Sequence, residues 1–243
     1  MGYTRNSKNP KFRCKGIEIS QRSNGGTRVE IERSRMNQPY INIEQGSDEW
    51  KLARLGHVTA SNMADVMSKG KGNAEAIGRY KYKVRLVAER LTLTAGESFS
   101  NAAMEWGVEQ EQFACIEYEA ATNQFVDKTG FWLHPNIPYL GVSPDRLVGD
   151  KGLIEVKCPN TTTHLGYLFE GKIPTDYYKQ IHCQLWVTDR EWCDFVSYDP
   201  RLPKRNQLLI VRTERDESLI KEMEAETLKF LDEVESLIIK LGA

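Results

Sequence analysis

The sequence predicts a mixed α/β (α+β) fold in which a central mixed sheet is flanked by helices. Short apolar and β-branched runs at residues 153–156 and 192–198 are typical of buried strands. Longer stretches at 100–121 and 216–241 repeat apolar residues every three or four positions, as amphipathic helices do. Because 243 residues suffice for a complete core, one domain that carries both kinds of element is expected.

The composition is typical of a globular cytoplasmic protein. Charged residues make up 28% and hydrophobic residues 40% of the chain, and the formal net charge is −1. The five cysteines are odd in number and lack Cys-x-x-Cys spacing, which disfavours zinc and disulfides and fits a reducing cytosol. No apolar run approaches the roughly 20 residues of a membrane span, so no membrane partner is expected.

The N-terminal segment differs from the rest of the chain. Residues 1–35 hold nine basic and three acidic side chains, a net charge of +6, and the other 208 residues carry −7. Little apolar periodicity accompanies this charge, so a disordered extension is expected over 1–38 and a single domain over 39–243. The extension is either a tail that attracts DNA or a dispensable addition, with Met36 as the start. The second reading is favoured because recognisable organisation begins only near residue 40.

The first helices of the domain surround a candidate anion site. Ser47 is expected to cap a helix that ends near Leu55, and Thr59 or Ser61 to cap a second helix. A basic loop follows at 69–72. A hydroxyl-capped helix N-terminus beside an arginine can bind an anion, and an ordinary capped helix is the simpler alternative.

Two longer helices follow, at 80–93 and 100–121, and each has an apolar stripe that predicts a buried face. Glu111 is the misfit on the second stripe. A buried carboxylate needs a partner, which a metal site would supply, whereas a position at the edge of the stripe would let it reach water. The stripes comprise Tyr80, Val84, Val87 and Leu91 in the first helix, and Met104, Val108, Glu111, Cys115 and Tyr118 in the second.

The rest of the chain continues the mixed pattern. The polar run at 160–164 could approach a phosphate backbone, and the scattered histidines are read as ordinary core or surface residues. The last helix is expected to pack on the core or on a neighbouring subunit. The expected strands lie at 40–43, 124–133, 139–141, 192–198 and 208–211, and the further helices at 174–188 and 216–241.

A predicted hairpin holds the most informative charges. Residues 141–145 and 152–157 read as two strands joined by a glycine-containing turn. Glu155 and Lys157 are two positions apart on the second strand, so they share one face, and Asp145 on the partner strand can reach that face. Such charges are seldom buried unless they are paired or bind a metal.

This arrangement suggests metal-dependent hydrolysis of a phosphodiester. Two carboxylates with open coordination positions suit Mg²⁺ or Mn²⁺, which lowers the pKa of a bound water and neutralises charge on phosphate oxygens. Lys157 could orient the attacking water or stabilise the transition state. A structural salt bridge between Glu155 and Lys157 on an exposed edge strand is the alternative.

Several short motifs, in order, resemble those of the phage lambda exonuclease and YqaJ-like viral recombinase family, within the restriction-endonuclease-like nuclease superfamily. The resemblance extends over roughly residues 45–216. It implies a restriction-endonuclease-like core. The matching motifs are Arg54-Leu55-Gly56, Thr59-Ala60-Ser61, Trp106-Gly107 with Glu111, Ser143-Pro144-Asp145, Glu155-Val156-Lys157-Cys158-Pro159, Trp186-Val187-Thr188 and Tyr198-Asp199-Pro200-Arg201.

The resemblance implies a processive 5′-to-3′ exonuclease that degrades one strand of linear double-stranded DNA with two Mg²⁺ ions. It releases 5′-mononucleotides and leaves a 3′ single-stranded overhang. Members of the family form homotrimeric rings around DNA and serve phage recombination beside a single-strand annealing protein. The same resemblance implies a cytoplasmic protein of a bacterial host, encoded by a phage or prophage.

The resemblance also assigns roles to individual residues. It makes Asp145, Glu155 and the Val156 carbonyl metal ligands, with Glu111 supporting the metal site. Lys157 assists the water and Gln180 completes the active site. Residues for the 5′-phosphate and for splitting the end base pair are implied as well: Arg54, Ser61 and Lys71 for the phosphate, and Met104 as the apolar wedge.

The chain departs from the family pattern at two of these positions. Lys71 stands where an arginine makes the second basic phosphate contact, and lysine offers a point charge in place of a bidentate fork. Gln184 stands where many related nucleases have tyrosine. Two other functions remain open: an endonuclease on the same fold, which would not need a pocket for a terminal phosphate, and a non-catalytic DNA-binding recombination scaffold, which would not need the carboxylates.

Overall fold

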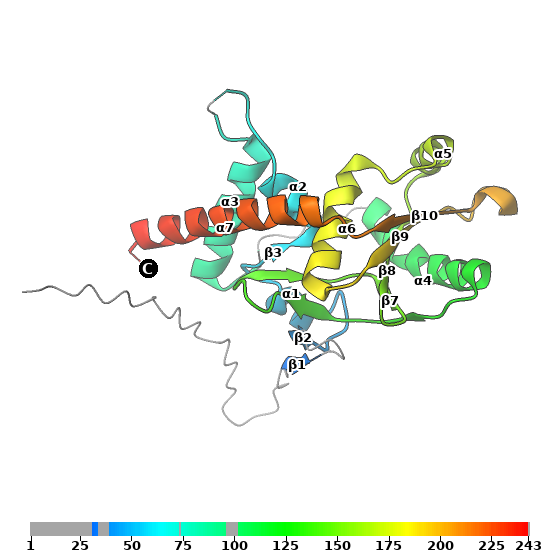
Figure 1. Ribbon diagram of the computed structural model, residues 1–243, viewed down its shortest axis with the longest axis horizontal. Helices are drawn as coiled ribbons and strands as arrows, with labels where there is room; N and C mark the ends of the chain where they lie inside the picture. The colour runs from blue at the N-terminus through cyan, green and yellow to red at the C-terminus, as the bar shows by residue number, and fades with distance from the viewer. Residues whose placement is uncertain (1–30, 34–38, 73, 96–101, 243) are drawn as a thin grey trace, which may run out of the picture.

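The computed structural model describes residues 31–33, 39–72, 74–95 and 102–242. They form two five-stranded sheets with helices packed on them, which confirms the predicted mixed α/β class, although one central sheet was expected (Figure 1). The strands are β1 (Ile31–Arg33), β2 (Pro39–Ile41), β3 (Val58–Thr59), β4 (Val126–Asp127), β5 (Phe131–Leu133), β6 (Leu140–Val142), β7 (Arg146–Val148), β8 (Gly152–Lys157), β9 (Trp192–Tyr198) and β10 (Leu208–Glu214). The α-helices are α1 (Asp48–Ala53), α2 (Met63–Val66), α3 (Ile77–Thr92), α4 (Ala102–Thr122), α5 (Thr161–Glu170), α6 (Thr175–Thr188) and α7 (Glu217–Lys240).

The first sheet has the strand order β1-β2-β5-β6-β3, in which only the β3–β6 pair among the described strands is parallel. Its β1 strand, Ile31–Arg33, pairs with β2 and falls within the segment expected as an extension. Residues 1–30 lie outside the described residues, and so does most of the expected extension.

The second sheet has the order β10-β9-β8-β7-β4, and β8 pairs in parallel with β9 and antiparallel with β7. Alternate residues of β8 point to opposite faces. Ile154 packs against α4 through Tyr118, whereas Leu153 packs against α6 through Ile181. Because Glu155 is two residues from Leu153, it also faces α6.

The predicted hairpin is only partly correct. The turn at 149–152 joins β7 to β8 as expected, but β6 ends at Val142 in the first sheet and β7 begins at Arg146 in the second. Pro144 lies between them and has no N–H to continue a ladder, so the strand breaks there. Asp145 therefore lies at the crossing from one sheet to the other, directly before β7.

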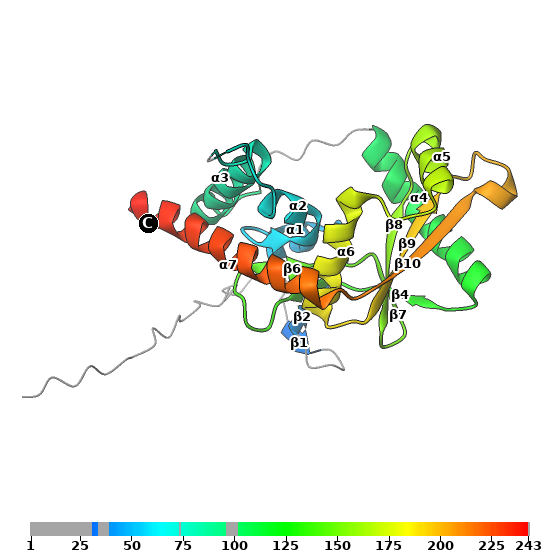
Figure 2. The same cartoon turned by 45° about the horizontal axis from the view of Figure 1, so that its top comes forward.

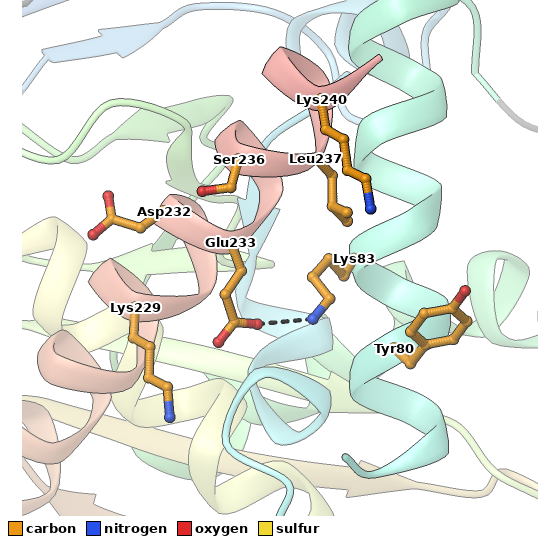
Figure 3. Close-up of a pocket in the computed structure, with 8 residues that line it drawn as sticks. All are labelled: Tyr80, Lys83, Lys229, Asp232, Glu233, Ser236, Leu237 and Lys240. Atoms are coloured by element: carbon orange, nitrogen blue, oxygen red, sulfur yellow. Dashed lines mark hydrogen bonds and ion pairs between the residues drawn. The ribbon is translucent and has the colours of Figure 1, made fainter. Parts of the chain in front are cut away.

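Of the predicted apolar stripe of α3, only Val87 is buried. Tyr80, Val84 and Leu91 are exposed, and the buried face carries Arg79 and Lys83 beside apolar side chains. The two cations donate to Glu233 of α7 at 2.5 and 2.8 Å, and Figure 3 shows the second of these contacts. Ion pairing with α7 thus allows the charged side of the helix to point inward.

Other expectations had mixed outcomes. Ser47 caps α1 as expected, through its hydroxyl and the Trp50 N–H at 3.1 Å. Thr59 precedes the short helix η1 (Ala60–Asn62), but its side chain makes no capping hydrogen bond. The polar run at 160–164 opens helix α5, which was not predicted, and Asn160 caps it by accepting from the Thr163 N–H at 2.9 Å. Among the described helices, none has the length and apolar character needed to cross a bilayer.

Candidate active site

The site forms where β7, β8 and α6 meet, beside the crossing between the two sheets. Figure 2 shows α6 packed along the sheet that contains β8. Four of the predicted site residues are brought together there: Asp145, Glu155, Lys157 and Gln180.

Glu155 is the centre of this cluster. Its side chain is 1% exposed, and both of its oxygens accept hydrogen bonds. Oε1 accepts from the Lys157 ammonium and from Gln180 Nε2 at 2.5 Å, and Oε2 accepts from Gln184 Nε2 at 2.7 Å. The carboxylate is therefore fixed by three donors from two elements. The exposed salt bridge on an edge strand is excluded for the Glu155–Lys157 pair, because β8 is an inner strand and Glu155 is buried.

The ionised form of Asp145 is disfavoured by its surroundings. Its Oδ2 accepts from the Val156 N–H at 2.7 Å. Burial, followed by the nearby Glu155 carboxylate, raises the pKa of Asp145 well above its ordinary value, while Lys157 opposes that rise. Two neighbouring carboxylates thus have one ammonium near them, that of Lys157, so their negative charge exceeds the positive charge beside it.

Lys157 remains a cation in this surrounding. Burial alone would lower the pKa of its ammonium, but Glu155 and Asp145 outweigh burial and raise the pKa above the ordinary value. The ammonium nitrogen also lies 5.0 Å from the centre of the Tyr177 ring, which favours a positive charge.

Glu111 on α4 has a partner that the sequence did not reveal. Its Oε1 accepts from Arg146 Nη1 at 2.6 Å, and the same nitrogen donates to the Asp145 carbonyl at 2.5 Å. The partner that a carboxylate on this stripe requires is an arginine, one residue beyond Asp145. Arg146 could have been suspected only from its place beside Asp145.

The donor set fits a hard divalent cation. Within the described residues, no group of three or more His, Cys, Asp or Glu side chains is arranged as a metal site. Two carboxylates and the Val156 carbonyl remain, and that carbonyl points to the same strand edge as the Val156 N–H that binds Asp145. Mg²⁺ commonly binds one or two carboxylates and completes its shell with water and substrate phosphate.

Arg54 is linked to the site through Trp50. The guanidinium lies over the Trp50 ring at 3.9 Å from its centre, and Trp50 Nε1 donates to Ser143 Oγ at 2.9 Å. Ser143 is two residues before Asp145. Burial lowers the pKa of Arg54 to about 10, so the guanidinium is a poorly hydrated cation that an anion would stabilise.

Ser61 lies in a polar cluster with a second arginine. Its Oγ accepts from Asn62 Nδ2 at 3.2 Å, and Asn62 Oδ1 accepts from Arg85 Nη2 at 2.7 Å. The charge of Arg85 also acts on Arg54. Sequence reasoning missed Arg85, because it is a basic residue on a helix face with no motif around it.

The other two predicted residues are not joined to this cluster. Lys71 is an exposed residue of the loop after α2, and no contact in the described part of the chain connects it with Arg54 or Ser61. Met104 falls in α4, but its side chain lies outside the described residues.

A hollow of about 720 Å³ between α3 and α7 is a separate feature. Figure 3 shows it lined by charged side chains of both helices, with Lys83 and Glu233 paired across it. None of the predicted site residues lines it. The ion pair between Lys83 and Glu233 accounts for two of these charges.

The chain is similar to known proteins in both sequence and fold. The chain matches the YqaJ-like viral recombinase domain over residues 49–191. It is 47% identical to an alkaline exonuclease, LHK-Exo, from Laribacter hongkongensis, with a TM-score of 0.76 over 81% of this chain and 96% of that one. LHK-Exo in complex with dAMP aligns with a TM-score of 0.75 and 48% identity, over 80% of this chain and 96% of that one.

Two more distant proteins are similar as well. A phage-related exonuclease from Haemophilus somnus shares the fold, with a TM-score of 0.61 and 15% identity over 76% of this chain and 96% of that one. An uncharacterised mimivirus protein is 25% identical over 64% of this chain. The matched region spans only 29% of that protein's length. The family model covers more than half of the 243 residues, and LHK-Exo matches nearly along its whole length. The chain belongs to the YqaJ-like viral recombinase family.

Proposed function

We propose that the chain is a Mg²⁺-dependent, processive 5′-to-3′ exonuclease on linear double-stranded DNA. It releases 5′-mononucleotides and leaves a 3′ single-stranded overhang for recombination by single-strand annealing. The observation that carries this proposal is the pair of neighbouring carboxylates, the half-buried Asp145 and the buried Glu155, with the Lys157 ammonium bound to Glu155. The similarity to LHK-Exo, an alkaline exonuclease, supports the same class of reaction.

Asp145, Glu155 and the Val156 carbonyl would hold two Mg²⁺ ions, with Glu111 supporting them through Arg146. When bound, the ions lower the pKa of a water and neutralise charge on the phosphate; Mn²⁺ is expected to substitute. Gln180 holds the Glu155 carboxylate in place. Lys157 directs a permanent positive charge at the phosphate, where negative charge grows in the transition state.

The reaction is the addition of water across a P–O bond. The water oxygen bonds to phosphorus, and the 3′-oxygen of the terminal nucleotide leaves and takes a proton. The next nucleotide then carries the new 5′-phosphate. Arg54 and Ser61, with Lys71 from its exposed loop, would hold that phosphate, so each cut produces the end that the pocket prefers. Met104 would serve as the wedge that parts the end base pair.

Processivity would come from assembly. A homotrimeric ring that encloses the duplex cannot leave until the DNA ends, so weak overall charge is tolerable. The expected partner is a single-strand annealing protein, and the expected setting is the cytoplasm of a bacterium that carries the phage or prophage. Residues 1–35, with their net charge of +6, would be dispensable for the nuclease.

The test is digestion of a linear duplex that is labelled at each 5′ end and carries either a 5′-phosphate or a 5′-hydroxyl. With Mg²⁺, we expect 5′-mononucleotides, released faster from the phosphorylated end; with EDTA, none. Covalently closed circular DNA is the matched control. Cuts in the circle would instead identify an endonuclease, and binding without cleavage in Mg²⁺ or Mn²⁺ would identify a scaffold.

A further inference from the structure

Helix α3 carries three polar side chains that face the segment between α1 and α2. Tyr82, Arg85 and Glu89 are three and four positions apart, so they lie on one side of the helix. The Tyr82 hydroxyl accepts from the Thr59 N–H at 3.0 Å, and Glu89 Oε2 accepts from the Gly56 N–H at 2.9 Å. Arg85 therefore lies between two contacts that fix α3 to the segment of the candidate phosphate site.

Two contacts hold the Arg85 guanidinium in place. It lies over the Tyr82 ring at 4.6 Å from the ring centre, and its Nη2 donates to Asn62 Oδ1 at 2.7 Å. The Asn62 amide nitrogen in turn donates to Ser61 Oγ at 3.2 Å. Because that oxygen accepts from Asn62, the hydroxyl hydrogen of Ser61 can be donated to another acceptor. Arg85 and Ser61 are thus neighbouring donors that share one amide.

Little within the described residues neutralises the charge of Arg85. Its Nε lies 3.8 Å from Glu89 Oε1, and the side chain is 48% exposed, so solvent weakens this ion pair. The other oxygen of Glu89 is bound to the Gly56 N–H. A guanidinium has five N–H donors, and the contacts of Arg85 in the described part of the chain use few of them.

Arg54 is a second cation at this place. Its guanidinium lies over the Trp50 ring, and no carboxylate of the described residues is paired with it. Burial is the main cause of the lowered pKa of Arg54, and the charge of Arg85 lowers that pKa further. An anion that contacts both arginines would relieve this repulsion. A phosphate monoester suits them, because its oxygens accept paired hydrogen bonds from guanidinium groups.

We propose that Arg85 is the second guanidinium of the pocket for the 5′-terminal phosphate, in the role that the family resemblance gave to Lys71. Arg85 is joined to Ser61 through Asn62, whereas no contact in the described part of the chain joins Lys71 to either residue. Arg85 is then a residue that determines specificity for the phosphorylated end and takes no part in breaking the P–O bond. This inference rests on the phosphate pocket of the proposed function but not on cleavage.

Binding to DNA ends without cleavage tests the proposal. Dissociation constants are measured in EDTA for one duplex that carries 5′-phosphates and for the same duplex with 5′-hydroxyls. The wild type should bind the phosphorylated duplex more tightly. Arg85→Gln should reduce the ratio of the two affinities about tenfold or more, because a charge-assisted hydrogen bond is lost, and should change the affinity for the hydroxyl duplex little.

Three further variants complete the test. Arg85→Lys keeps the charge but not the planar fork, so an intermediate ratio is expected. Lys71→Gln should change the ratio far less than Arg85→Gln does. Arg205→Gln removes an exposed guanidinium from the turn before β10 and is the matched control, which should leave the ratio unchanged.

Four results would overturn the proposal. A wild type that binds both duplexes equally would remove the phosphate pocket itself. An unchanged ratio in Arg85→Gln would make Arg85 a structural partner of Asn62, and equal weakening of both duplexes would make it a general contact to DNA. A larger loss in Lys71→Gln would return the role to Lys71. A wild type that prefers phosphorylated ends in EDTA but cleaves nothing in Mg²⁺ would refute the proposed nuclease and leave this inference in place.

Discussion

Gln184 donates its side-chain amide to Glu155 Oε2 at 2.7 Å, and both residues are 1% exposed. Gln184 lies one turn of α6 after Gln180, which donates to the other oxygen of the same carboxylate. The α6 helix thus holds both oxygens of the central site residue. In the described part of the chain the buried Gln184 Oε1 has no hydrogen-bond partner, so this residue contributes a donor at the cost of an unsatisfied acceptor.

Gln184→Leu should therefore lower both the stability of the fold and the rate of cleavage. The substitution leaves Glu155 Oε2 buried without that donor, which costs about 1–3 kcal/mol, but it also removes the unsatisfied amide oxygen, so the low end of this range is expected. Urea unfolding measures the loss. The rate of cleavage should also decrease. Gln207→Leu alters a glutamine directly before β10, whose side chain bonds to Pro200 and Leu202, and it should spare cleavage. An unfolding curve and a rate equal to those of the wild type would contradict the role of Gln184.

Asp145→Asn should abolish cleavage while stabilising the fold. Asparagine keeps an oxygen that can accept from the Val156 N–H, but it removes the charge that opposes Glu155. A gain of about 1 kcal/mol raises Tm by about 2–4 °C in a domain of this size. Thermal unfolding in EDTA gives the stability, and binding to an uncleaved duplex shows that the DNA site persists. Retained cleavage would refute the assignment of Asp145 as a ligand.

Arg54→Lys should reduce the preference for a 5′-phosphorylated end. The guanidinium stacks on Trp50 and offers a planar fork, and an ammonium reproduces neither property. Loss of one charge-assisted hydrogen bond, about 1.5–3 kcal/mol, corresponds to at least a tenfold fall in the ratio of rates for phosphate and hydroxyl ends. Lys51→Ala alters an exposed cation of α1, the helix that ends directly before Arg54, and serves as control. An unchanged ratio would remove Arg54 from the pocket.

The stability of the fold should fall with pH below about 6.5. Burial lowers the pKa of His57 and of His134 to about 4, so both rings are neutral when folded. Between the ordinary value of about 6.5 and the folded value of about 4, the unfolded chain binds protons that the folded chain does not. Each histidine then contributes a slope of up to about 1.4 kcal/mol per pH unit, with stability lost as pH decreases.

His134→Asn tests this assignment. The ring accepts from the backbone N–H groups of Asn136 and Ile137 at 3.2 and 2.9 Å, and an asparagine oxygen can take over these bonds without titrating. Denaturant unfolding at pH 7.5, 6.5 and 5.5 gives the free energy of unfolding at each pH. This free energy should decrease less steeply with falling pH in His134→Asn than in the wild type. The same pH dependence of the unfolding free energy in both proteins would contradict the assignment of His134 as a neutral ring in the folded state.

Sequence patterns were sufficient for the elements whose burial follows from local periodicity. Helices α6 and α7 and strands β9 and β10 lie close to their expected bounds, because each has one apolar face and clear ends. The same reasoning failed for most of α3, where Tyr80, Val84 and Leu91 are exposed and only Val87 of the stripe is buried. The inward face combines Tyr82 and Leu86 with Arg79 and Lys83, and local periodicity does not reveal that Glu233 of α7 pairs with these two cations.

The sequence by itself determined that Glu155 and Lys157 share a face of one strand, since that depends only on the two-residue period of a strand. Tertiary structure alone decided that Asp145 stands at the crossing between two sheets, that Gln180 and Gln184 hold Glu155, and that Arg146 is the partner of Glu111. These contacts join residues 25 to 35 positions apart. They depend on how helices pack on the sheet, and no local pattern of residues specifies that packing.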